Sequence, residues 1–489
     1  MNKVALLASA LIWASIGTPE AASSLAAGVC GKAAPADGSQ PPSTAAVVRL
    51  AKDWVATINS ADDAAYLRFV ETRGPALGDG VEPLPFRDFL RGMELCGVKS
   101  AKADAVEMWV FDPNLDSYGI WRFKPGSTDA DKTQFLGGSF TEEIPPGAVA
   151  PPKLPVPALI EAVDQLAASR ATKDQFSGAI LVAQNGRVLF QKAYGLADRA
   201  RGKPNTLDTQ FRFGSMGKMF TAVAIMQLVE AGKIDLQAPV GRYLTNYPNQ
   251  DIATKVTVAH LLSHTGGTGN IFGPEFNRAK ASLRSTKDYI DLYGNRAAEF
   301  APGSRKSYSN FGFILLGRIV DEVSGLSYDD YIQRNIFKPA GMTSTGNRPE
   351  TENLPRRAVG YTGSGAKLKS AADTLPLNGT AAGGGYSTVG DFNRFMEGLT
   401  SHRLLRRETL QKLIDGGVKT AHGEFVGFDF SETVPDAGRW IGHAGGAPGM
   451  SGTLQHFLNS GVTLIVLANR DPTSVKGIAK FAEHRLPAN

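Results

Sequence analysis

Residues 211–226 read FRFGSMGKMFTAVAIM, and from Ser215 onwards this stretch has the pattern of a helix. Gly232 is a suitable stop, because glycine readily takes the left-handed conformation that ends helices. The apolar stripe of this helix consists of Met219, Ala222, Val223, Met226 and Val229. Because residues three apart are neighbours on a helix surface, we expect Ser215 and Lys218 to share one face.

A serine and a lysine in this arrangement suit acyl transfer. A serine hydroxyl is a weak nucleophile until a base takes its proton, and lysine is such a base only where burial or a neighbouring cation depresses its pKa. The helix N-terminus adds partial positive charge that favours an oxyanion. The spacing alone is a weak signal, since Ser364 and Lys367 repeat it in a loop rich in glycine and serine, with no helical pattern behind it.

A tyrosine followed two residues later by an asparagine is the second element of the pattern. It occurs at residues 308–310, 247–249 and 293–295. Only Tyr308 follows a proline-glycine turn and precedes an apolar helical pattern, so we expect it at a loop-to-helix corner. There a phenol beside a cationic lysine can lose its proton and share the role of base, while Asn310 orients the substrate and the lysine.

A glycine-rich strand near the C-terminus is the third element. It contains His443, Gly445 and Gly446, and glycines let a substrate lie against backbone N–H groups, which is how half of an oxyanion hole is built. His264 is the competing histidine, but it follows a helical pattern, and we expect it to lie away from the terminal strands. Either histidine alone is more often structural than catalytic.

In this order and with these separations, the three elements resemble the serine β-lactamase and penicillin-binding-protein superfamily. The branch is the class C-like one, which includes D-alanyl-D-alanine carboxypeptidases, D-aminopeptidases and β-lactamase-like esterases. The resemblance covers residues 158–489 and includes the segments 211–214, 261–267 and 382–388. The fold it implies is an antiparallel sheet flanked by helices, with an all-helical lobe.

The resemblance also implies a role for each residue of the pattern. Ser215 is acylated, Lys218 and Tyr308 shuttle the proton, and Asn310 holds the substrate. The backbone N–H groups of Ser215 and Gly446 form the oxyanion hole. The substrate is then a small-molecule ester, a peptide or a β-lactam.

One departure from the family pattern bears on the substrate. True β-lactamases usually carry lysine at the position of His443, and that cation binds the substrate carboxylate. Histidine can be uncharged near neutral pH, so we expect no strict requirement for a substrate carboxylate. We therefore expect an esterase or a D-amino-acid peptidase or carboxypeptidase. The alternatives are a β-lactamase and a non-catalytic penicillin-recognition scaffold with a binding or regulatory role.

The resemblance also implies that residues 261–267 and 383–388 are supporting structure and not catalysts.

The rest of the chain predicts a leader and two α+β domains. Residues 1–27 have the pattern of a signal peptide, with a lysine before a short apolar stretch, and residues 28–44 that of a linker. Residues 45–144 combine a helical pattern with alternating strands and weakly resemble the NTF2-like fold. A proline-rich linker, residues 145–157, separates them from the β-lactamase-like domain, residues 158–489.

Within the second domain, strand patterns occur at both ends. A helix over 159–168 is followed by a hairpin over 178–193 that turns at Asn185 and Gly186, and strands recur at 453–457 and 462–468. Mostly helical patterns lie between them. We expect one antiparallel sheet built from both ends of the domain, with a helical insertion and a cleft where the two meet.

Composition and residue spacing bear on nucleic-acid binding, metal binding and location. The chain has 489 residues and a formal net charge of +5, and no basic run with interleaved aromatics supports nucleic-acid binding. The seven histidines lack metal-ligand spacing, so we expect neither a metal nor a cofactor. The leader predicts export to the periplasm or secretion, with no stable membrane insertion after its cleavage. Cys30 and Cys96 either form a disulfide or are two unrelated thiols, and the oligomeric state stays open.

Overall fold

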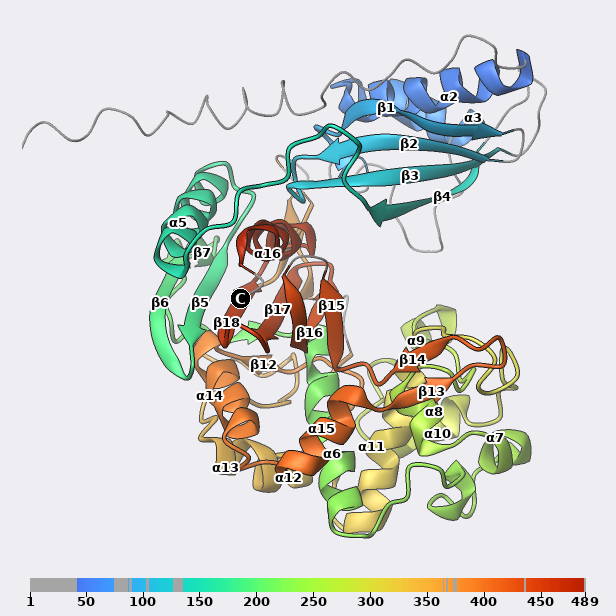
Figure 1. The fold of residues 1–489 in the computed structure, drawn as a ribbon. Coiled ribbons are helices and arrows are strands. Elements are labelled where there is room, and N and C mark those ends of the chain that lie inside the picture. Colours follow the sequence, from blue (N-terminus) through green and yellow to red (C-terminus); the bar gives the residue numbers. More distant parts are fainter. Residues whose placement is uncertain are drawn as a thin grey trace, which may run out of the picture. The chain divides into compact units, whose positions relative to one another are not determined.

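The structure, a computed structural model, divides into two compact units, Met1–Pro151 and Pro152–Asn489 (Figure 1). The structure describes residues 42–73, 87, 90–102, 105–125, 135–363, 365, 368–372, 376–434 and 437–487, with the backbone only at 42–47, 124–125, 135–140 and 434. The predicted signal peptide, residues 1–27, lies outside them. None of the described helices is both long enough and apolar enough to span a bilayer.

The first unit has two helices followed by a four-stranded antiparallel sheet. The helices are α2 (Pro42–Asn59) and α3 (Asp63–Thr72). Strands β1 (Glu94–Lys102), β2 (Ala105–Asp112), β3 (Ser117–Pro125) and β4 (Phe135–Glu142) pair in chain order. This is the α+β organisation that the sequence predicts, and the likeness to the NTF2-like fold stays a prediction.

The start of α2 corrects one predicted boundary. Residues 42–44, the last three of the predicted linker 28–44, are helical. Proline suits the first turn of a helix, because the N–H that it lacks would have no partner there. Cys96 is buried in β1 and is not a free cysteine, whereas Cys30 lies outside the described residues, so a bridge between them stays a prediction.

The second unit is built around a six-stranded antiparallel sheet. Its spatial order is β15 (Ser431–Val434), β16 (Gly438–Ala447), β17 (Met450–Phe457), β18 (Val462–Ala468), β5 (Gly178–Gln184) and β6 (Arg187–Tyr194). The pairing of β18 with β5 joins the two ends of the unit, as predicted. Asn185 and Gly186 turn the hairpin with positive φ angles of 50° and 79°.

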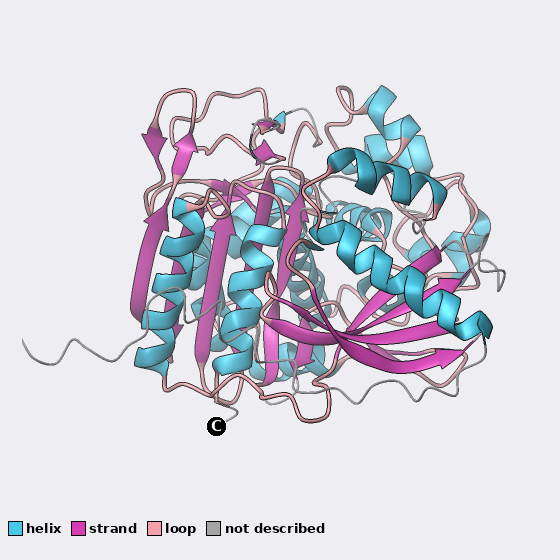
Figure 2. Cartoon of the chain, turned by 90° about the horizontal axis from the view of Figure 1, so that it is seen from above, coloured by secondary structure: helices cyan, strands magenta, loops and turns pink. Residues whose placement is uncertain are grey.

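Helices cover both faces of this sheet (Figure 2). On one face, α5 (Val156–Thr172) and α16 (Thr473–Arg485) bury side chains against the strands, among them Leu159 and Ile478. The start of α5 at Val156 places the last two residues of the predicted linker 145–157 in the helix. The larger core, on the opposite face, contains the helix that follows Ser215.

The insertion between β6 and β15 is mostly helical. Its helices are α6 (Lys218–Glu230), α7 (Gln250–Lys255), α8 (Val258–Leu262), α9 (Pro274–Ala279), α10 (Thr286–Tyr293), α11 (Asn310–Ser324), α12 (Tyr328–Ile332), α13 (Lys338–Ala340), α14 (Val389–Thr400) and α15 (Arg407–Asp415), with short 3-10 or π turns η1 (Gly214–Gly217), η2 (Val240–Arg242) and η3 (Gln333–Phe337). Its short strands are β7 (Leu196–Asp198), β8 (Lys203–Pro204), β9 (Phe211–Arg212), β10 (Tyr361–Thr362), β11 (Lys369–Ser370), β12 (Tyr386–Ser387), β13 (Gly417–Lys419) and β14 (Phe425–Gly427).

Helix α6 is more deeply buried than the predicted one-sided stripe requires. Its buried residues include Lys218 and Thr221 as well as the apolar ones. A helix that is apolar nearly all round lies inside a protein rather than on its surface. The first turn of α6, next to Ser215, is therefore held by core packing on several sides.

Candidate active site

Ser215 lies in the tight turn η1, and α6 itself begins at Lys218. The predicted helix start is therefore shifted by one turn, but the two side chains still meet on one face. Gly214 makes the turn with a φ of 53°, a conformation that favours glycine. The turn is also packed from outside, because a Cβ on Gly383 would lie 2.4 Å from the carbonyl oxygen of Gly214.

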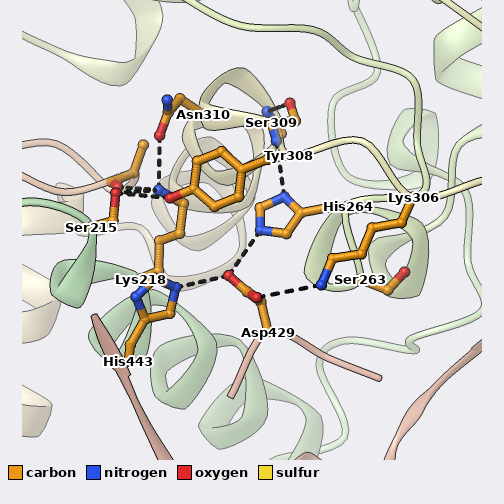
Figure 3. Close-up of polar contacts among 12 residues, drawn as sticks. Ser215, Lys218, Ser263, His264, Lys306, Tyr308, Ser309, Asn310, Asp429 and His443 are labelled. Carbon is orange, nitrogen blue, oxygen red and sulfur yellow. Dashed lines mark hydrogen bonds and ion pairs between the residues drawn. The ribbon is translucent and has the colours of Figure 1, made fainter. Parts of the chain in front are cut away.

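Four residues of the predicted pattern come together around the hydroxyl of Ser215 (Figure 3). The Tyr308 hydroxyl donates to Ser215 Oγ at 2.8 Å, and Lys218 Nζ lies 3.3 Å from the same oxygen. Lys218 Nζ also donates to Asn310 Oδ1 at 2.8 Å and to the carbonyl oxygen of Ala382 at 2.5 Å. A neutral amine has two N–H groups and one lone pair. Since the two other acceptors can take both N–H groups, the lone pair of a neutral Lys218 is left for the Ser215 hydroxyl.

Burial shifts the pKa of both groups that contact Ser215. Lys218 is 0% exposed, and this burial lowers its pKa to about 7, although the charge of Asp429 acts in the opposite direction. Tyr308 is 41% exposed as a whole, but its hydroxyl points inward at Ser215, and burial raises the pKa of the phenol. The phenol therefore keeps its proton and acts as a donor here, and Lys218 is the better placed base.

Strand β16 passes directly against the turn that carries Ser215. A Cβ on Gly445 would lie 2.2 Å from the carbonyl oxygen of Phe213 and 2.9 Å from the backbone nitrogen of Ser215. The backbone nitrogen of Gly446 would lie 3.1 Å from a Cβ on Gly214. The nitrogens of Ser215 and Gly446 therefore lie on neighbouring, closely packed segments, as the predicted oxyanion hole requires.

The close approach at Gly445 predicts that even a methyl group is harmful there. A Gly445→Ala variant must separate β16 from the turn by roughly 1 Å, and a misplacement of this size can lower kcat/KM by about a hundredfold. Ester hydrolysis and thermal unfolding of the purified variant would measure it. Gly390→Ala is the matched control, because its Cβ would meet nothing closer than the end of Arg394 at 3.5 Å. Equal activity of both variants would show that the approach is not needed.

The third predicted element, His443, faces a carboxylate that no sequence motif marks. Its Nε2 lies 2.8 Å from Asp429 Oδ2, and the same oxygen lies 3.0 Å from His264 Nε2 (Figure 3). The expectation that His264 lies away from the terminal strands is thus wrong. The segment after β14 returns to the end of α8, where the N–H of Asp429 donates to the carbonyl of Leu262 at 3.1 Å.

The positions of the protons in this cluster follow from the hydrogen bonds that its members make. Burial acts to raise the pKa of Asp429, but the charge of His443 and hydrogen bonds from both histidines hold it well below its usual range. An ionised carboxylate only accepts, so both Nε2 atoms donate to it. His264 Nδ1 accepts from the backbone N–H of Ser309 at 3.1 Å, and burial lowers the pKa of His264, so this ring is neutral.

Sequence reasoning missed Asp429, although a weak signal exists. Asp429 stands between Phe428 and Phe430, and a carboxylate between two large apolar residues suggests a buried charge with a partner. It also missed Asn270, whose Oδ1 accepts from Asn310 Nδ2 at 2.9 Å and so fixes which end of that amide faces Lys218.

The competing patterns do not join this cluster. The hydroxyl of Tyr293 donates to the carbonyl of Ile271, while Tyr247 is a core residue. Ser364 and Lys367 lie outside the described residues. Among the residues that the structure does describe, no group of three or more histidine, cysteine or acidic side chains could hold a metal ion.

An antiparallel sheet, a helical insertion and a serine-lysine-tyrosine cluster where they meet define a serine hydrolase of the class that includes β-lactamases and penicillin-binding proteins. The family model described as Beta-lactamase matches residues 163–487, so the chain belongs to the β-lactamase family.

Individual relatives include hydrolases with different substrates. The chain is 31% identical over 337 residues to a penicillin-binding protein of Bacillus subtilis (strain 168), which is 64% of this chain and 73% of that protein. It is 31% identical over 316 residues to esterase EstB of Burkholderia gladioli, covering 57% of this chain and 79% of the esterase. A D-stereospecific amidohydrolase from Streptomyces sp. matches with a TM-score of 0.54 and 26% identity, over 65% of this chain and 97% of that one.

Proposed function

We propose that this protein hydrolyses ester or amide bonds of small molecules through an acyl-enzyme on Ser215. The observation that carries the proposal is the position of Ser215 Oγ, between the Tyr308 hydroxyl and the amine of a fully buried Lys218. Such a serine has a donor on one side and a base on the other, which is the arrangement that activates a nucleophile.

Acylation begins when neutral Lys218 takes the proton of the Ser215 hydroxyl while Oγ attacks the substrate carbonyl. The negative charge that forms on the carbonyl oxygen is stabilised by the backbone N–H groups of Ser215 and Gly446. The tetrahedral intermediate then collapses, and the leaving alcohol or amine takes a proton relayed from Lys218 through Tyr308. Asn310 accepts a hydrogen bond from the amine of Lys218 and orients the substrate beside it.

Deacylation repeats these steps with water. Lys218 takes a proton from the attacking water, which adds to the acyl carbon, and Ser215 leaves with a proton returned to its Oγ. The product acid departs and the free serine is restored. Each proton taken by Lys218 is given back within the same half-reaction, so the cycle needs no cofactor.

Two relatives support a choice within this class of reaction. One similar protein is named an esterase and one similar structure a D-stereospecific amidohydrolase. We therefore infer short-chain esters or D-amino-acid amides and peptides as substrates. β-Lactam hydrolysis is the second candidate, favoured by the family itself, and the intact trio Ser215, Lys218 and Tyr308 argues against a non-catalytic scaffold.

The leader supports a proposal about location. Residues 1–27 have the composition of a cleaved signal, so we infer that the protein acts outside the cytoplasm, in the periplasm or after secretion. Mass spectrometry of the mature protein from the extracellular or periplasmic fraction would give its first residue. An intact leader on cytoplasmic protein would contradict the proposal.

The proposed function is tested with a fluorophosphonate probe and a substrate panel. The probe should label the wild-type protein at Ser215, as located by peptide mass spectrometry. The panel contains a p-nitrophenyl acyl ester, a D-alanine amide and a chromogenic cephalosporin. Turnover of the ester or the amide supports the proposal, turnover of the cephalosporin alone favours the second candidate, and a protein that is neither labelled nor active refutes both.

A further inference from the structure

Asp429 is an ionised carboxylate inside the candidate site that the proposed acyl-enzyme chemistry does not use. Its side chain remains 20% exposed, so it is not sealed in the core. Both histidines contact its Oδ2, and Lys306 Nζ lies 3.8 Å from its Oδ1. Figure 3 shows these three basic side chains converging on Asp429 next to Lys218.

Neither ring nitrogen of His443 is free to bind a substrate. Nε2 donates to Asp429, and Nδ1 lies against the carbonyl oxygen of Ala444, its own chain neighbour. The side chain is only 11% exposed. Whatever the protonation of Nδ1, His443 presents no unpaired N–H to an incoming carboxylate, because both nitrogens already face acceptors within the protein.

The basic groups around this position all face the carboxylate of Asp429. Where His443 is doubly protonated, its charge is paired with Asp429, and where it is neutral the carboxylate remains beside it. Lys306 is 49% exposed, and its nearest acid is again Asp429. The charge of Asp429 also acts on Lys218 and on the Tyr308 phenol. Lys218 is fully buried and contacts Ser215, so it does not offer a cation to a substrate carboxylate.

We propose that Asp429 is a specificity-determining residue that makes this site select substrates without a carboxylate in the leaving group. It does so by accepting a hydrogen bond from His443 and pairing with Lys306, two neighbouring groups that could otherwise bind an anion. The substrate class is then neutral esters and amides, including amino-acid amides, rather than peptides with a free C-terminal carboxylate. This inference rests on the proposed function, whose nucleophile it takes as Ser215.

The test compares two aryl esters that share an acetyl group and differ only in one leaving-group substituent. These are 3-acetoxybenzamide, which is neutral, and 3-acetoxybenzoate, which carries a carboxylate. The measured quantity is the ratio of their kcat/KM values. Because both esters need the same Ser215 and Lys218, any change in the pKa of Lys218 affects both equally and cancels in the ratio.

The wild-type protein should prefer the neutral ester by about tenfold or more, because a carboxylate that enters a partly buried site where the cations are already paired loses hydration without gaining a partner. In Asp429→Asn the preference should disappear or reverse, mainly because kcat/KM for 3-acetoxybenzoate rises. Asp415→Asn is the matched control, since it removes the same charge from an exposed pair with Arg439 and should keep the wild-type ratio.

A second variant tests the inference independently in case Asp429→Asn does not fold. Lys306→Met removes a half-exposed cation and should increase the preference for the neutral ester, because Asp429 then loses a compensating charge. An unchanged ratio in Lys306→Met, or in a folded Asp429→Asn, overturns the inference, as does a wild-type preference for 3-acetoxybenzoate. A wild-type protein that is neither labelled at Ser215 nor active on either ester would instead overturn the proposed function, and the inference with it.

Discussion

A Ser215→Ala variant is expected to lose about 10⁴-fold or more in kcat/KM on any ester or amide that the wild-type protein hydrolyses, as is usual when a serine nucleophile is removed. Without Oγ there is no acyl-enzyme, and the activity that remains comes from the backbone donors and from substrate binding alone. Steady-state hydrolysis and fluorophosphonate labelling measure both consequences. The fold should be kept, because the substitution removes one oxygen from a tight turn and fills no space.

The matched control for this prediction is Ser364→Ala. Ser364 belongs to the second serine-x-x-lysine sequence in the chain, so a search by motif alone would rank it with Ser215. Its removal should leave both labelling and turnover at the wild-type level. If the two alanine variants behave alike, the assignment of the nucleophile is wrong.

A Lys218→Met variant is expected to lose about 10³-fold or more in the rate of acylation while it still folds. Methionine fills a similar volume among the core residues around the first turn of α6, but it cannot take a proton. A stopped-flow burst with a p-nitrophenyl ester separates acylation from deacylation. Lys233→Met, an exposed lysine beyond the end of α6, is the control and should keep its burst.

The pH dependence of the wild-type protein gives an independent test of Lys218. Burial lowers the pKa of this amine to about 7, and only the neutral amine can act as a base. The value of kcat/KM should therefore be low at acid pH and rise as the pH increases through about 7. An unperturbed lysine would place this rise near pH 10.4, so a rise only at such a pH would contradict the proposed role.

The backbone pattern of the second unit could largely be predicted from the sequence. The hairpin turn at Asn185 and Gly186, the two last strands and the helix after Ser215 all follow from local residue preferences. Pairing of the first and last strands also follows, because an apolar strand pattern at each end needs a partner. What this reasoning missed is that α6 is buried nearly all round, since burial on every face depends on the elements that surround a helix.

The individual candidates Ser215, Lys218 and Tyr308 were likewise available from the sequence, because short motifs with helical spacing act locally. Their choice over the competing patterns depended on the order of three motifs along the chain. The structure then added what the motifs do not contain: the burial that lowers the pKa of Lys218, and the carbonyl of Ala382 that takes one of its protons.

Ser215 and Lys218 were thus determined by the sequence alone, as neighbours one turn apart. Tertiary structure alone decided the surroundings of His443. It brings His264 and His443 to the same carboxylate oxygen of Asp429, although His264 and Asp429 stand 165 positions apart in the chain. No local preference encodes such a meeting, because it depends on long-range packing of β16 and α8 around a buried charge.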